Sequence, residues 1–156
     1  MPRTLVAGVG NIFLGDDGFG VEVAQQLSRE EFPCEVHVRD FGIRGLHLAF
    51  ELLGGDYATT ILVDATARGG APGTIYLIEP EFDASGAPAT ADAHTMDPQT
   101  VFATLKALGG TPGQVWIVGC EPESLDEGIG LSGPVAAAVN EAAQLVRHLV
   151  ARGSVG

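Results

Sequence analysis

Acidic residues follow three apolar runs of the sequence, at the points where predicted strands end. Asp16 and Asp17 follow the first run, Asp40 closes the second, and Asp64 lies near the end of the third. Because the carboxyl ends of parallel strands meet at one edge of an α/β sheet, and sites form there, we expect these side chains to converge. A single aspartate after a strand is common, since aspartate also forms turns. Its recurrence after all three runs therefore favours a functional site.

One histidine is placed to join these carboxylates. His94 lies near the end of residues 79–95, a long stretch without helix or strand periodicity. Loops of that length are usually functional or disordered. Two carboxylates and one imidazole suit a borderline divalent cation and leave positions open for water or for ligands from a substrate. Such a set without a thiolate makes a poor structural site, so a metal held there would exchange. The alternative is that His94 is a surface histidine without a ligand role.

Alternating strand and helix patterns position these residues. Apolar runs predict buried strands over 5–9, 59–65 and 115–120, and alternation predicts a half-buried strand over 34–40. Helical spacing predicts helices over 21–29, 46–53, 98–108 and 135–149. The short link from the third strand into 73–78 predicts an antiparallel edge hairpin. This order predicts one α/β domain over residues 1–156 with three layers: a mostly parallel, twisted sheet of about five strands, with helices on both faces.

Composition excludes several classes of protein. Twenty acidic residues stand against eight basic ones, and a net charge of −12 repels phosphate backbones, so we expect no nucleic-acid partner. No apolar run approaches the ~20 residues that span a bilayer. The first residues lack the pattern of a secretory signal. We therefore expect a cytoplasmic protein with no membrane partner.

The two cysteines and the acidic residues after the last strand are weaker candidates for a functional role. Cys34 and Cys120 are far apart and form no Cys-x-x-Cys pair, which excludes a structural zinc site and disfavours a disulfide framework. Cys34 is expected inside a strand. Cys120 ends a strand but has no neighbouring base that would activate a nucleophile. Glu121 and Glu123 are expected either at the rim of the site, in contact with substrate, or on a solvated loop.

Two familiar site types fit the opening segment poorly. Gly8 and Gly10 could begin a dinucleotide-binding turn, but Ile12-Phe13 replaces the third glycine and acids occupy the turn. A receiver domain also carries acids after its first and third strands, yet it needs a lysine after its last strand. Lys106 is the single lysine of the sequence and falls in a predicted helix.

The sequence resembles the hydrogenase maturation proteases, endopeptidases that trim the C-terminal extension from the large subunit of [NiFe] hydrogenases. Five matching segments run in register along nearly the whole chain: 8–21, 40–45, 63–65, His94 and 119–124. The resemblance implies an endopeptidase that cuts a large-subunit precursor after nickel insertion and uses the substrate-bound nickel as its recognition element. Family convention groups these enzymes with aspartic peptidases, although the Asp-Thr-Gly loops of pepsin-like enzymes are absent here.

The resemblance also implies roles for individual residues. Asp17, Asp64 and His94 match the metal-contacting positions, and Asp17 and Asp40 are the expected catalytic residues. The nickel is expected to arrive with the precursor, its protein partner, and not to be held tightly by the free protein. A carboxylate of Asp17 or Asp40, or a nickel-bound water, would supply the base or nucleophile, and the choice stays open. The alternative function is a non-catalytic nickel-binding or delivery protein for hydrogenase assembly.

Overall fold

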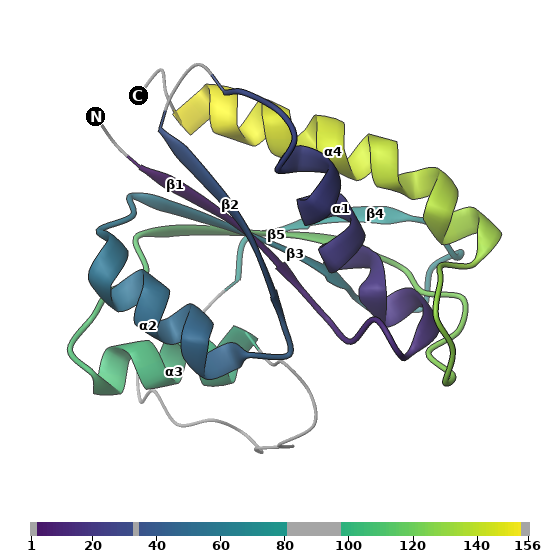
Figure 1. The fold of residues 1–156 in the computed structure, drawn as a ribbon, viewed down its shortest axis with the longest axis horizontal. Helices are drawn as coiled ribbons and strands as arrows, with labels where there is room; N and C mark the ends of the chain where they lie inside the picture. The colour runs from purple at the N-terminus through teal and green to yellow at the C-terminus, as the bar shows by residue number, and fades with distance from the viewer. Residues whose placement is uncertain (1–2, 33–34, 81–97, 154–156) are drawn as a thin grey trace.

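A five-stranded sheet lies between two layers of helices in the computed structural model, which describes residues 3–32, 35–80 and 98–153 (Figure 1). The strands are β1 (Thr4–Val9), β2 (Val36–Gly42), β3 (Thr59–Ala65), β4 (Ile75–Ile78) and β5 (Gln114–Cys120). The helices are the short 3-10 helix η1 (Gly15–Gly18), α1 (Phe19–Leu27), α2 (Gly45–Gly55), α3 (Pro98–Ala107) and α4 (Gly133–Gly153). The expected three-layer α/β fold is confirmed.

Both faces of the sheet are buried, as the continuous apolar runs of its inner strands require. Helices α1 and α4 cover one face, and α2 and α3 cover the other (Figure 1). Successive residues of β1 alternate between the two layers: Val6 packs with α1 and α4, whereas Leu5 and Ala7 pack with α2 and α3. In the described part of the chain, no helix is long and apolar enough to cross a bilayer.

The strand order is β2-β1-β3-β5-β4, with β4 antiparallel to its neighbour and the other pairs parallel. The predicted hairpin between β3 and β4 is wrong, because β4 pairs with β5. Strand β3 has β1 on one side and β5 on the other, with β5 in register from Thr59↔Gln114 to Ala65↔Cys120. No edge of β3 is left for β4, which therefore becomes the edge strand beyond β5.

Helix α1 lies unusually close to the sheet. A Cβ on Gly20 would lie 2.0 Å from the Val63 carbonyl oxygen and 2.5 Å from that of Val9. Only glycine allows the helix backbone to approach β1 and β3 so closely. This contact fixes the start of α1, and with it η1, against the carboxyl ends of the two central strands.

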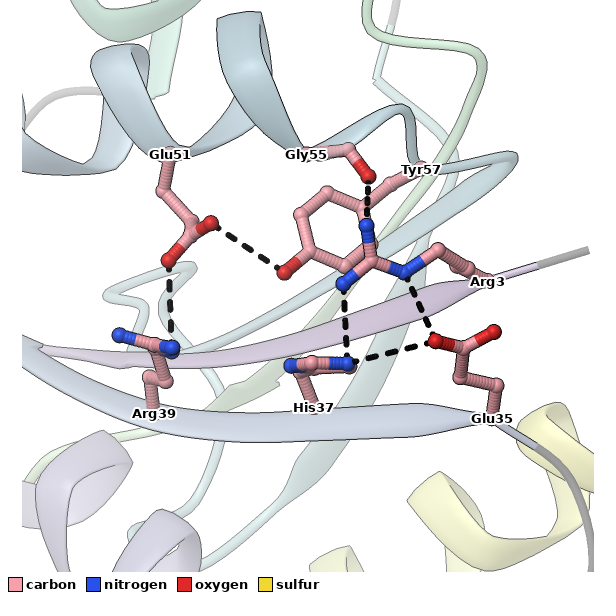
Figure 2. A network of polar contacts seen from close by, with 7 residues as sticks. All are labelled: Arg3, Glu35, His37, Arg39, Glu51, Gly55 and Tyr57. Carbon is pink, nitrogen blue, oxygen red and sulfur yellow. Dashed lines mark hydrogen bonds and ion pairs between the residues drawn. The ribbon is translucent and has the colours of Figure 1, made fainter.

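A polar network ties the start of β1 and the edge strand β2 to the end of α2 (Figure 2). Arg3 is its centre: the guanidinium donates to the Gly55 carbonyl oxygen and lies 4.9 Å from the centre of the Tyr57 ring. Glu51 of α2 forms an ion pair with Arg39 of β2 at 3.3 Å. Because Arg3 precedes β1, the centre of the network lies at the amino end of that strand, away from the carboxyl edge.

Candidate functional site

The expected carboxylates lie at the edge where the parallel strands end, around the place where the strand order reverses. From β1 the chain crosses to β2 on one side, whereas β5 and β4 lie on the other side of β3. Asp17 follows β1 in η1, and Asp64 is the second-last residue of β3. The two residues therefore flank the switch point between β1 and β3, which is where open α/β sheets bind their ligands.

The turn after β1 holds Asp17 in place. Gly10 has a φ of 135°, and a Cβ there would lie 1.9 Å from the Asp17 carbonyl oxygen. Its N–H donates to the Gly42 carbonyl oxygen at 2.9 Å and so ties the ends of β1 and β2 together. The next residue, Asn11, donates its backbone N–H to Asp17 Oδ2 at 2.8 Å. Asp17 Oδ2 therefore has a fixed donor. Asn11 was not among the site residues expected from the sequence, although Gly-Asn directly after a strand is typical of such a turn.

Asp64 shares its surroundings with Asp17. Burial, and next the negative charge of Asp17, raise the pKa of Asp64 well above its ordinary value, and a hydrogen bond with the Ala65 backbone opposes them. Two carboxylates that repel each other in a partly desolvated place are stabilised by a bound cation. The structure thus brings together two of the three residues expected to contact a metal.

The third expected metal contact, His94, lies outside the described residues, as does most of the stretch 79–95 that carries it. Within residues 3–32, 35–80 and 98–153, no group of three or more histidine, cysteine or acidic side chains could hold a metal ion. Asp17 and Asp64 alone supply too few ligands for a tight metal site, so a metal bound there would need further ligands from elsewhere in the chain or from a substrate.

Asp40 lies at the end of the neighbouring strand with an exposed carboxylate. Its Oδ1 accepts the Gly42 N–H at 2.8 Å, and its carbonyl oxygen accepts a hydrogen bond from Arg44 Nη2 at 2.8 Å. Among the described residues, no hydrogen bond joins the Asp40 side chain to Asp17 or Asp64. The structure therefore places Asp40 at the same edge of the sheet as the pair, on the neighbouring strand β2.

Asp16 differs sharply from its neighbour Asp17, because it is buried and faces the loop between β5 and α4. Its Oδ2 accepts hydrogen bonds from the backbone N–H groups of Glu123 and Ser124, at 2.8 and 3.0 Å. Ser132 donates its N–H to Oδ1 at 2.7 Å and its hydroxyl to Oδ2 at 2.8 Å. Burial raises the pKa of Asp16, but these hydrogen bonds outweigh burial and lower it. Asp16 is thus a clasp that fixes the loop and not a member of the metal pair.

Glu121 has a similar structural task on the other side of β5. The expectation of a rim or solvated position is wrong for this residue, which is only 5% exposed. Its Oε1 accepts the N–H groups of Arg68 and Gly70 and the Tyr76 hydroxyl, at 2.8, 3.0 and 2.7 Å. These bonds lower the pKa of Glu121. Glu123, in contrast, is exposed on the loop.

The surroundings of Cys120 disfavour a nucleophilic thiol. It is fully buried at the end of β5. Burial, followed by the negative charges of Asp16, Glu121 and Glu141, raises its pKa to about 11. At neutral pH the thiol therefore stays protonated, in agreement with its expected lack of an activating base. Cys34 lies outside the described residues.

Comparison with known proteins places this chain in a family. A family model described as hydrogenase maturation protease matches residues 21–148. The chain belongs to the hydrogenase maturation protease family. The hydrogenase 2 maturation protease of Escherichia coli is 32% identical to it over 146 residues, which are 92% of this chain and 88% of that protein.

Solved structures of hydrogenase maturation proteases agree. A hydrogenase 2 maturation peptidase from a Thaumarchaeota archaeon is 35% identical, with a TM-score of 0.74 over 96% of this chain and 98% of that chain. A hydrogenase maturating endopeptidase from E. coli is 30% identical, with a TM-score of 0.80 over 99% and 94%. The resemblance noted in the sequence and the expected enzyme class, a peptide hydrolase of hydrogenase maturation, are confirmed.

Proposed function

We propose that this chain removes the C-terminal extension of a [NiFe] hydrogenase large-subunit precursor after nickel has been inserted. The observation that carries the proposal is the position of Asp17 and Asp64 on the two sides of the switch point, where burial, and next the negative charge of Asp17, raise the pKa of Asp64. Membership in the maturation protease family supports the peptide-cleaving activity. A nickel ion carried in by the precursor would relieve the repulsion between the two carboxylates, and precursor binding would gain that energy.

The proposed sequence of events begins with recognition. Asp17 and Asp64, together with His94, contact the substrate's nickel and so hold the nearby peptide bond in a fixed place. Asp17 Oδ2 already accepts the Asn11 N–H, which orients the carboxylate before the substrate arrives. Precursor without nickel offers these carboxylates no cation, so it binds weakly and stays uncut.

The cleavage step needs a base to activate water, or a nucleophile. Asp40 and Asp17 are the candidate carboxylates, and a water on the substrate's nickel is the third candidate. Asp40 lies on the strand next to β1, with its Oδ1 fixed by the Gly42 N–H and its carboxylate exposed to an incoming substrate. Asp17 is the carboxylate of this pair that would also contact the metal.

A cleavage assay tests the proposal. Purified protein is mixed with the precursor of the organism's own large subunit, loaded with nickel or free of it, and release of the C-terminal peptide is followed by mass spectrometry. We expect cleavage of the loaded precursor alone. Asp17→Asn, Asp64→Asn and His94→Ala should each lower the rate by about 100-fold or more, whereas Asp56→Asn, an exposed site after α2, should not change it.

Three results would contradict the proposal. Equal cleavage of both precursor forms would exclude nickel as the recognition element. Full activity in all three site variants would show that the metal contacts lie elsewhere. Nickel transfer to a precursor that is never cut would support the alternative function, a non-catalytic nickel-delivery protein.

A further inference from the structure

Two loops that are far apart in the sequence join directly beside the turn that holds Asp17. The segment after β1 and the segment between β5 and α4 lie side by side at the carboxyl edge (Figure 1). Leu14 and Gly128 form a parallel bridge. The Gly128 N–H donates to the Phe13 carbonyl oxygen, and the Gly15 N–H donates to that of Gly128, both at 2.9 Å. These backbone bonds make one continuous surface from the two loops.

A groove of about 430 Å³ runs along this junction. Its lining consists of Asn11, Phe13, Leu14, Glu127, Gly128 and Ile129. Two of the three large apolar side chains in it are highly exposed, Phe13 by 61% and Ile129 by 78%. Single exposed apolar residues are ordinary, but two that line the same groove indicate a surface that another molecule covers. We call this feature the Phe13–Ile129 groove.

The groove is fixed before any partner arrives. Asp16 holds the β5–α4 loop at both ends, through the N–H groups of Glu123 and Ser124 on one side and Ser132 on the other. Since the loop that carries Ile129 lies between these points, little conformational freedom remains to be lost on binding. A rigid apolar groove of this kind binds a partner more tightly than a loose loop would.

The groove begins at the candidate site. Asn11 lines it, and the N–H of the same residue is the donor that fixes Asp17 Oδ2. A polypeptide lying in the groove therefore contacts Asn11, the residue whose N–H fixes one of the two paired carboxylates. The Phe13–Ile129 groove is thus placed to bind chain close to the bond that is cut.

Charge defines what fits there. Residues 121–133 contain four acidic residues and no lysine or arginine, and Glu127 lines the groove itself. Glu123 and Asp126 add two exposed carboxylates on the same loop. A complementary segment carries an apolar side chain next to a lysine or arginine. A second copy of this chain is a poor occupant, because each copy has a net charge of −12.

We propose that the Phe13–Ile129 groove binds a segment of the substrate precursor that presents an apolar side chain beside a basic residue, next to the scissile bond. The identity of the partner rests on the proposed function, whereas the chemistry of the bound segment rests on the groove. Phe13 and Ile129 cover the apolar side chain, and Glu127 pairs with the basic residue.

The test measures precursor binding and cleavage separately. The variants are Phe13→Ser, Ile129→Ser and Glu127→Lys, and the control is Leu108→Ser, which removes an apolar side chain that is 44% exposed after α3 and lies outside the groove. Dissociation constants for nickel-loaded precursor come from biolayer interferometry, and KM and kcat come from the cleavage assay. Each groove variant should raise Kd and KM by about tenfold or more, with the smaller effect on kcat. Leu108→Ser should match the wild-type protein.

The outcomes separate failure of the groove from failure of the proposed function. Wild-type protein that binds the precursor without cutting it contradicts the proposed function, and the Kd values of the variants still decide the groove. Wild-type protein that cuts the precursor, with unchanged Kd and KM in the variants, overturns the groove proposal alone. Self-association that is lost in Phe13→Ser and Ile129→Ser would assign the groove to a second copy of the chain and also overturn it. Circular dichroism checks that every variant is folded.

Discussion

At the scale of single residues, Asp16 and Asp17 are adjacent and acidic but have opposite surroundings. Asp16 is buried and accepts four hydrogen bonds, so its charge is satisfied by the protein itself. Asp17 accepts one backbone bond and raises the pKa of Asp64. Only the second carboxylate is available for a cation. Consecutive residues in a 3-10 turn point in different directions, and that geometry assigns the two roles.

Replacing Asp16 tests its role as a clasp. Asp16→Asn keeps the shape of the side chain but replaces one carboxylate oxygen by an amide NH₂. This NH₂ group is itself a donor, so it cannot accept a hydrogen bond from the backbone N–H groups that it faces. We expect a loss of roughly 2–4 kcal/mol in the free energy of unfolding, because the donors are buried and lose a charged acceptor. Urea unfolding measures the loss. Asp126→Asn, an exposed change on the same loop, is the control. Equal stability of the two variants would contradict the clasp.

Asp64→Asn should have the opposite effect on stability. The asparagine removes a charge that is disfavoured by burial and by the charge of Asp17. At pH 7 we expect a gain on the order of 1 kcal/mol, or about 2–4 °C in Tm, together with loss of cleavage. Differential scanning calorimetry and the cleavage assay measure the two effects. A lower Tm would show that the Asp64 carboxylate is stabilised by contacts within the protein, and not strained by its place in the site.

At the scale of elements, the close approach of α1 to the sheet determines where η1 places Asp17. Gly20→Ala puts a Cβ against the carbonyl oxygens of Val63 and Val9, both in backbone that cannot yield. We expect a loss of about 2–4 kcal/mol and reduced cleavage, since α1 must move away from β1 and β3. Gly54→Ala in α2 is the matched control: no atom lies within 4 Å of its new Cβ, so stability should stay equal or rise by about 0.5–1 kcal/mol. Equal stability in both variants would exclude the close contact.

The strands and helices could be predicted from the sequence wherever the periodicity of apolar residues alone determines them. The strands and helices follow from apolar runs and helical spacing, and the parallel sheet follows from their alternation. The partner of β4 was not predictable, because it depends on which strand edge the later strand β5 leaves free. Local pattern carries no information about that choice.

The candidate site was predictable to a similar depth. Aspartates after successive strands placed Asp17 and Asp64 at one edge, because parallel strands end together. The clasp of Asp16 and the buried position of Glu121 were not predictable, since each depends on backbone N–H groups of loops that the chain supplies more than 40 residues away. In a sequence, an acidic residue that accepts hydrogen bonds from buried backbone N–H groups cannot be distinguished from an acidic residue on the surface. The only indication is the glycines and serines of the loops that supply the N–H groups.

At the scale of the whole molecule, the acidic side chains make stability depend on pH in two opposing ways. The folded-state pKa values of Asp16, Glu30 and Glu121 are lowered, by backbone hydrogen bonds at Asp16 and Glu121 and by Arg147 at Glu30. Each contributes stability that is present above its unfolded pKa and is lost as the pH falls through the folded value. Asp64 acts in the reverse sense: its contribution is present below its unfolded pKa of 3.8 and is lost as the pH rises through the raised value.

The stability of the protein should therefore pass through a maximum at mildly acidic pH. As the pH falls towards the unfolded pKa of Asp64, Tm should rise, because the raised pKa favours protonation of Asp64 in the folded protein and the repulsion within a chain of net charge −12 decreases. Below about pH 4, Tm should fall as the clasping carboxylates are protonated. Calorimetry across this range measures the profile. In Asp64→Asn the rise in Tm on acidification should become smaller, and in Asp16→Asn the fall in Tm at low pH should become smaller. A wild-type Tm that keeps rising to pH 8 would mean that Asp64 is not strained in the folded protein, and the pairing of Asp17 with Asp64 would lose its electrostatic basis.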